Sequence, residues 1–182
     1  MTRIVSFILC MVFFFTLTGC ARDAFGHETY TNTDSYHKIF DLNEIRFKEE
    51  AFELFPKEIE SLGTASFYCE WELGIVGSAR VEIALSVNYT ETAFAEEVGR
   101  LKGLCNGKAV YNDQTFQFPA YVTVLGYNHT NYYALVDEQN SRIHYVLLQL
   151  ISDENIDIDK SLLPNGYGEL GEVQGMSYYA YE

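Results

Sequence analysis

Residues 153–164, DENIDIDKSLLP, place acidic or amide side chains at every second position, in the way that a calcium-binding loop begins. These side chains are Asp153, Asn155, Asp157 and Asp159. A loop of the EF-hand type also needs glycine at its sixth position, for a sharp turn, and glutamate at its twelfth, as a bidentate ligand. Here those positions hold Ile158 and Pro164. The segment is therefore predicted to be a solvated acidic loop, and we expect neither a metal site nor a cofactor.

Two cysteines, Cys69 and Cys105, fall in the part of the chain that is expected to fold. The first lies in an alternating segment and the second on an apolar helical stripe, so both side chains are expected in one buried layer. They could form a disulfide, which is permitted outside the cytoplasm, or pack as two buried thiols. The thiols are favoured, because sharing a layer does not bring two Cα atoms within the roughly 7 Å that a disulfide needs. No CxxC pair is present, which disfavours redox catalysis.

Other catalytic patterns are absent from the sequence. It contains no GxSxG motif, no P-loop and no pair of histidines at helical spacing. The adjacent glutamates at 49–50 and 96–97 diverge by about 100° on a helix and cannot converge on one substrate. We therefore predict a domain without catalytic residues. The alternative is a hydrolase whose carboxylates are brought together only by the fold. A cleft that joins two acids, or an acid and His144, with shifted pKa values would favour that alternative.

The elements that position these residues follow from the spacing of apolar side chains. Residues 65–73 and 80–89 alternate between apolar and polar and are joined by a short link containing glycine, which predicts an antiparallel hairpin. Leu85 belongs to the predicted core face. The predicted solvent-facing positions include Tyr68, Glu70, Glu72, Glu82 and Ser86. Acids exposed in this way should titrate normally, so they suit a hydrated recognition surface better than catalysis.

Helices are predicted on both sides of this hairpin. The first begins at Asn43, a suitable N-cap, and ends near Leu54 because Pro56 follows. The second spans 90–105, with Thr90 as its cap and an apolar stripe that ends at Cys105. Further strands are predicted at 120–127, 132–137 and 142–152. The order α-β-β-α-β-β-β predicts an α+β fold, with an antiparallel sheet of about five strands and two helices on one face.

The N-terminus has the features of an export signal. Arg3 precedes an apolar run, 4–17, that is shorter than the ~20 residues of a membrane span. The residues Leu17, Thr18, Gly19 and Cys20 close this run. This tetrad resembles the lipobox of bacterial lipoproteins.

The resemblance implies that the Cys20 thiol carries a diacylglyceryl group and that signal peptidase cuts between Gly19 and Cys20. Two acyl chains anchor a protein stably where one does not. A lipid-anchored protein on the extracytoplasmic face of the cell membrane is therefore expected. The overall plan is similar in type to uncharacterised small lipoproteins of Gram-positive bacteria. The lipobox resemblance covers only the first 20 residues, and the likeness of plan includes no diagnostic motif in the domain, so no functional residue of the domain is carried over.

Composition limits the partners of the remaining chain. We expect a signal peptide at 1–19, the lipidated cysteine with a flexible polar tether at 20–38, and a single α+β domain at 39–182. With 26 acidic against 12 basic residues, the net charge is −14, which disfavours nucleic acid as a partner. An apolar content of 48% argues against disorder. We expect a binding or structural module at the cell surface, with a partner protein in the envelope.

Overall fold

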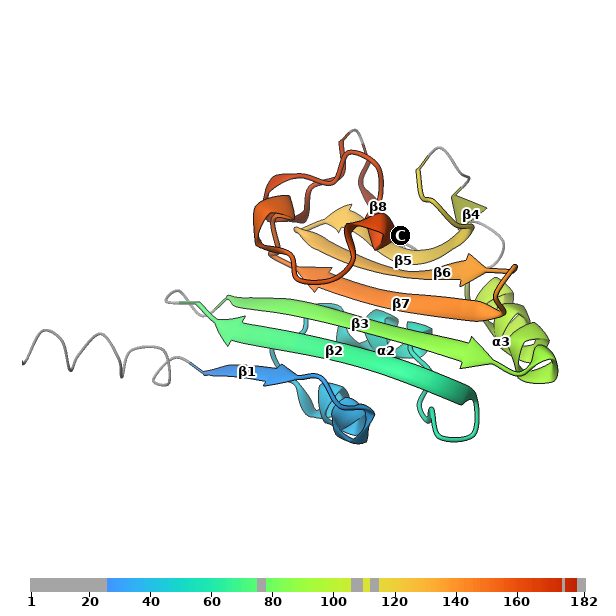
Figure 1. The fold of residues 1–182 in the computed structure, drawn as a ribbon. Coiled ribbons are helices and arrows are strands. Elements are labelled where there is room, and N and C mark those ends of the chain that lie inside the picture. Colours follow the sequence, from blue (N-terminus) through green and yellow to red (C-terminus); the bar gives the residue numbers. More distant parts are fainter. Residues whose placement is uncertain (1–25, 75–77, 106–109, 112–114, 175, 180–182) are drawn as a thin grey trace, which may run out of the picture.

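The computed structural model describes residues 26–74, 78–105, 110–111, 115–174 and 176–179. The predicted signal peptide, the lipobox-like tetrad and Cys20 lie outside these residues. An antiparallel sheet has the strand order β1-β2-β3-β7-β6-β5-β4, and β8 pairs with β5 (Figure 1). The strands are β1 (His27–Tyr30), β2 (Gly63–Leu73), β3 (Ala79–Tyr89), β4 (Val110–Tyr111), β5 (Ala120–Tyr127), β6 (Thr130–Asp137), β7 (Arg142–Gln149) and β8 (Tyr178–Tyr179). The predicted antiparallel sheet is confirmed in outline, with more strands than expected.

The hairpin of β2 and β3 follows the predicted alternation. Its register places Phe67 opposite Leu85 and Glu70 opposite Glu82. Leu85 is fully buried, as its place on the apolar side of β3 requires. Strand β3 then pairs with β7, with Ser86 opposite His144. The pairing of β3 with β7 therefore joins the β2–β3 hairpin to a meander formed by β5, β6 and β7.

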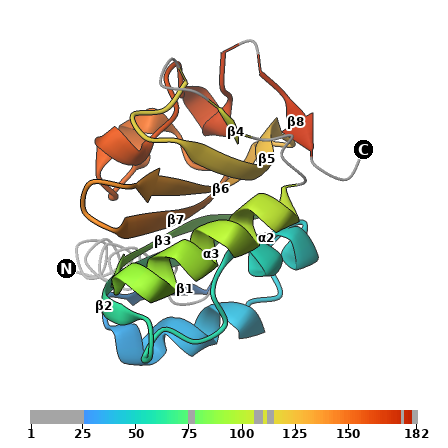
Figure 2. The same cartoon turned by 90° about the vertical axis from the view of Figure 1, so that its right-hand side faces the viewer.

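Helices cover one face of this sheet, as Figure 2 shows for α2 and α3. The longer elements are η1 (Thr33–Asp41), α2 (Lys48–Leu54) and α3 (Glu91–Leu104), and short 3-10 turns follow at η2 (Asp153–Asn155), η3 (Lys160–Leu162) and η4 (Glu169–Gly171). Thr90 caps α3 as predicted, because its hydroxyl accepts a hydrogen bond from the amide of Ala93 at 3.4 Å. Within the described ranges, none of the helices combines the length and hydrophobicity that crossing a bilayer requires.

The first predicted helix begins later than Asn43, and the reason is a buried glutamine on β7. The side chain of Gln149 is fully buried. It accepts a hydrogen bond from the amide of Arg46 at 2.7 Å and donates to the carbonyls of Glu44, at 3.0 Å, and Ala79, at 2.7 Å. The carbonyl of Glu44, which a helix starting at Asn43 would pair internally, accepts from Gln149 instead, and Phe47 has a left-handed φ of 48°, so α2 starts only at Lys48. It ends at Leu54, as predicted.

The segment expected to be a flexible tether is partly folded. Residues 26–38 of the predicted tether contain strand β1 and most of η1. Strand β1 pairs with β2, with Thr29 opposite Glu70, and Tyr36 of η1 is buried against Phe67. The prediction of a flexible tether was wrong here. Strand β1 forms because it pairs with a distant strand, and a segment of four residues is too short to show a repeating pattern of apolar side chains.

The second face of the sheet is covered by the C-terminal segment, residues 150–174. Several of its side chains are buried: Ile151, Ile158, Leu162, Tyr167 and Val173. The hydroxyl of Tyr133 on β6 donates to the carbonyl of Leu162 at 3.0 Å, which ties the segment to the sheet. The cover is tied to β6 through Tyr133 and reaches Glu82 on β3, whereas the same face of β2 stays polar.

The two cysteines are free, buried thiols. Cys69 lies on β2, while the thiol of Cys105 contacts the carbonyl of Val122 on β5 at 3.8 Å. Strands β2 and β5 are four spacings apart in the sheet, roughly 19 Å. The alternative of a Cys69–Cys105 disulfide is therefore incompatible with this fold.

Candidate functional site

Two polar hollows lie on the sheet face that the helices leave open, on either side of the C-terminal segment. We call the first the histidine pocket; it is about 530 Å³ and is lined by residues that include Ser66, Ser86, Asn88, Phe118, Asp137, Arg142, His144, Asp159 and Ser161. We call the second the acidic pocket; it is about 300 Å³ and is lined by Glu70, Glu72, Arg80, Ile151, Glu154, Asn155, Ile156 and Asp157.

A serine and a histidine form the floor of the histidine pocket. Because Ser86 and His144 are register partners on β3 and β7, their side chains project from the same face. Ser86 Oγ lies 2.7 Å from His144 Nδ1. The imidazole also stacks on Phe118, with ring centroids 5.9 Å apart. Both partners stand on paired strands, so the pair is held rigidly.

The imidazole of His144 is held in its neutral form. Its exposed fraction is 9%. Burial lowers the pKa of His144, and the neighbouring Arg142 lowers that pKa further, while Asp137 and Asp159 oppose the shift. A neutral imidazole can accept a proton or a hydrogen bond near pH 7.

Charged groups of both signs surround this pair. Arg142 Nε donates to the side-chain carbonyl of Asn88 at 2.5 Å. Asp137 accepts hydrogen bonds from Asn140 in the β6–β7 turn. Asp159 accepts a hydrogen bond from the amide of Ser161 at 2.9 Å. Hydrogen bonds from the backbone and the side chain of Ser161 lower the pKa of Asp159. The pocket therefore offers acceptors, donors and hydroxyl groups over a short distance.

Beside the acidic pocket lies the carboxylate of Glu82, whose burial the alternating pattern does not predict. Glu82 was expected to face solvent, but its exposed fraction is 1%, because residues 157–158 of the C-terminal segment lie over it. Its Oε1 accepts hydrogen bonds from the amides of Asp157, at 3.0 Å, and Ile158, at 2.8 Å. Burial raises the pKa of Glu82 to about 7, against the lowering effect of those two amides. The expectation of normal titration is therefore wrong for Glu82.

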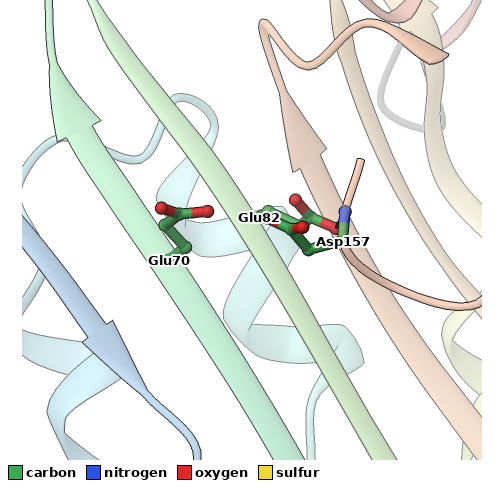
Figure 3. Close-up of side chains that lie close together, drawn as sticks. All are labelled: Glu70, Glu82 and Asp157. Atoms are coloured by element: carbon green, nitrogen blue, oxygen red, sulfur yellow. Dashed lines mark hydrogen bonds between the residues drawn. The ribbon is translucent and has the colours of Figure 1, made fainter. Parts of the chain in front are cut away.

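Three carboxylates meet at this point (Figure 3). Oxygen atoms of Glu70, Glu82 and Asp157 all lie within 4.8 Å of one another. Glu70 Oε1 lies 2.7 Å from His27 Nε2 on β1, and Glu70 Oε2 lies 3.0 Å from the hydroxyl of Tyr68. Burial raises the pKa of Glu70, but hydrogen bonds, from His27 first, outweigh it and lower that pKa overall. Tyr68, predicted to face solvent, is thus half-buried in a hydrogen-bonded cluster.

The acidic loop noticed in the sequence contributes differently from an EF-hand. Asp159 caps the short helix η3, and Asp153 begins η2. Asp157 joins the carboxylates of two strands that are more than 70 residues away in the chain. Spacing along the chain could not reveal this cluster. The run of alternating acids was the signal for Asp157, whereas Glu70 and Glu82 looked like ordinary solvent-facing residues.

Comparison with known proteins does not add to this geometry. Neither a protein-family model, nor a curated protein, nor a solved structure matches the chain.

Proposed function

We propose that the chain is a lipid-anchored protein on the extracytoplasmic face of the cell membrane, and that its domain binds a small polar solute in the histidine pocket. The anchor is the diacylglyceryl group that the lipobox resemblance implies for Cys20. The observation that carries the binding role is the pocket itself. Its volume of about 530 Å³ falls in the range of small-molecule sites.

The lining of the pocket defines the chemical class of the solute. Asp137 and Asp159 supply acceptors, Arg142 supplies donors, and the serine hydroxyls supply both. A solute with several hydroxyl, amide or amine groups, of the size of a disaccharide or dipeptide, would satisfy such a lining. The high net negative charge disfavours polyanionic ligands.

Filling the pocket tests the binding role. Ser66 is exposed at its rim, so Ser66→Phe should block the pocket without disturbing the core. Ser61→Phe, at an exposed position outside the lining, is the matched control. A panel of sugars, amino acids and dipeptides is added to the full chain, and the midpoint of thermal unfolding is measured. We expect at least one compound to raise the midpoint for wild type and Ser61→Phe only. A panel without any effect, or an effect that survives Ser66→Phe, would contradict the proposal.

The anchor is tested separately. Wild-type protein expressed in bacteria should partition into the detergent phase and carry a mass addition at a mature N-terminus that begins with Cys20. Cys20→Ala should stay uncleaved after Gly19 and lack the lipid. Unmodified Cys20 in secreted wild-type protein would refute the anchor while leaving the binding role untouched.

A hydrolase is the second candidate, and the Ser86–His144 pair favours it. In such an enzyme Ser86 Oγ would attack an acyl carbonyl while His144 Nδ1 takes the hydroxyl proton and later passes it to the leaving group. Water would then hydrolyse the acyl-serine. Binding is preferred because, within the described part of the chain, no carboxylate is hydrogen-bonded to the other ring nitrogen of His144.

A fluorophosphonate probe separates the two candidates. It forms a covalent bond only with an activated serine. The binding proposal expects Ser86 to stay unlabelled. Labelling of Ser86 that disappears in His144→Gln would instead establish the hydrolase.

A further inference from the structure

A buried carboxylate oxygen without a hydrogen-bond partner lies beside the acidic pocket, next to its lining residues Glu70 and Asp157. Glu82 Oε1 is satisfied by two backbone amides, but Oε2 is buried and has no hydrogen-bond partner among the described residues. A buried acceptor without a donor is costly, and a buried charged one more so. A ligand that brings positive charge to this oxygen would remove that cost.

The neighbouring carboxylates of Glu70 and Asp157 are also short of hydrogen-bond donors. The hydroxyl of Tyr68 is within hydrogen-bond distance of both Glu70 Oε2, at 3.0 Å, and Asp157 Oδ2, at 3.1 Å. A phenol carries one proton, so it can donate to only one of these carboxylates at a time. The cluster therefore has more acceptor oxygens than donors.

We propose that Glu70, Glu82 and Asp157 bind a divalent cation at the edge of the acidic pocket, and that this cation is calcium. An all-oxygen donor set suits hard cations and disfavours zinc, which takes nitrogen and sulfur ligands. The oxygens lie within 4.8 Å of one another. Bonds of about 2.3–2.6 Å to Ca²⁺ span this separation, and Mg²⁺ usually keeps several waters and takes only one or two carboxylates, so three carboxylates favour Ca²⁺.

The pocket has room for the rest of a coordination shell. Calcium takes about 6–8 oxygen ligands, so several waters must accompany three carboxylates. The volume of about 300 Å³ accommodates them, and Asn155 and Glu72 line the same space. Arg80 also lines the pocket, but it is paired with Glu72 at 3.6 Å. The three carboxylates come from β2, β3 and the C-terminal segment, so the cation would bridge that segment to the hairpin.

The experiment measures calcium binding to the full chain by titration calorimetry, and thermal unfolding in EDTA, CaCl₂ or MgCl₂. We expect a Kd of about 10⁻⁴–10⁻³ M, as in extracellular calcium modules. At about 100 times that concentration, calcium should raise the unfolding midpoint of wild type by roughly 5–10 °C. Magnesium should have a much smaller effect.

Three variants locate the site. Glu82→Gln keeps the acceptor for the two amides and removes the charge, so it should lose the calcium effect and be at least as stable as wild type in EDTA. Asp157→Asn, at an exposed position, should also lose the effect. Asp153→Asn, on the adjacent turn outside the pocket lining, should respond like wild type. Absence of calcium binding by wild type, an equal response to magnesium, or a full response in both Glu82→Gln and Asp157→Asn would each overturn the proposal.

Discussion

Replacing Gln149 with alanine is expected to destabilise the protein by roughly 3–5 kcal/mol. The side chain makes three hydrogen bonds in a fully buried position, to the amide of Arg46 and to the carbonyls of Glu44 and Ala79. Each contributes about 1 kcal/mol net, and each backbone group left unpaired inside the protein adds to the loss. A loss of this size is a large share of the ~5–15 kcal/mol that stabilises a typical domain.

Urea unfolding followed by circular dichroism measures the loss. Gln149→Met keeps most of the volume without the hydrogen bonds, so it should show most of the loss of Gln149→Ala. Gln139→Ala, at an exposed turn position, should change the free energy of unfolding by no more than about 0.5 kcal/mol. Hydrogen exchange at the amide of Arg46 should also accelerate in both Gln149 variants. If Gln149→Met equals the control, the buried hydrogen bonds do not hold the segment before α2, and the explanation for the late helix start is wrong.

Three further predictions concern the sheet and its thiols. Leu85→Ala should lower the free energy of unfolding by about 2–5 kcal/mol, because Leu85 is fully buried. Ser86→Ala should lower it by about 1 kcal/mol, through loss of the hydrogen bond to His144. Equal losses in urea unfolding would contradict the assignment of the two residues to opposite faces. Burial lowers the pKa of His144 in the folded protein. Below about pH 6.5 the unfolded chain therefore binds a proton at this residue that the folded chain does not bind. The free energy of unfolding consequently decreases as the pH falls from about 6.5 toward the folded pKa. His144→Gln should therefore lose less stability than wild type between about pH 7.5 and about pH 5.5. Burial raises the pKa of Cys69 to about 12 and that of Cys105 to about 11. A thiol reagent should therefore label neither cysteine in the native protein and both after unfolding. Rapid labelling of the native protein would show that the structure around these thiols opens to solvent.

Alternation along the chain was sufficient to predict the hairpin of β2 and β3. Every second residue of β3, from Val81 to Val87, is buried as the pattern requires, because a strand has only two faces and the apolar one must be covered. Helix α3 was predictable for a similar reason, since its cap at Thr90 and its apolar stripe are both local signals.

Features that depend on distant partners could not be predicted in this way. Strand β1 exists because it pairs with β2, and the start of α2 depends on Gln149, about a hundred residues later. The burial of Glu82 depends on residues 157–158, which carry no mark of where they dock. The Ser86–His144 pair likewise requires the register of β3 and β7. Both pockets are products of strand order, which the spacing of residues in one chain does not encode.

The cover formed by residues 150–174 is made after the strands that it covers. The strands from β1 to β7 are complete once Gln149 has been made, but the face that carries Tyr133, Val146 and Leu148 then has no cover. A chain interrupted after β7 would display an apolar sheet surface, which invites aggregation. Glu82 would remain hydrated in such a chain and would lose its water only when Asp157 and Ile158 dock. The last part of the domain to be translated therefore decides whether the finished sheet stays soluble.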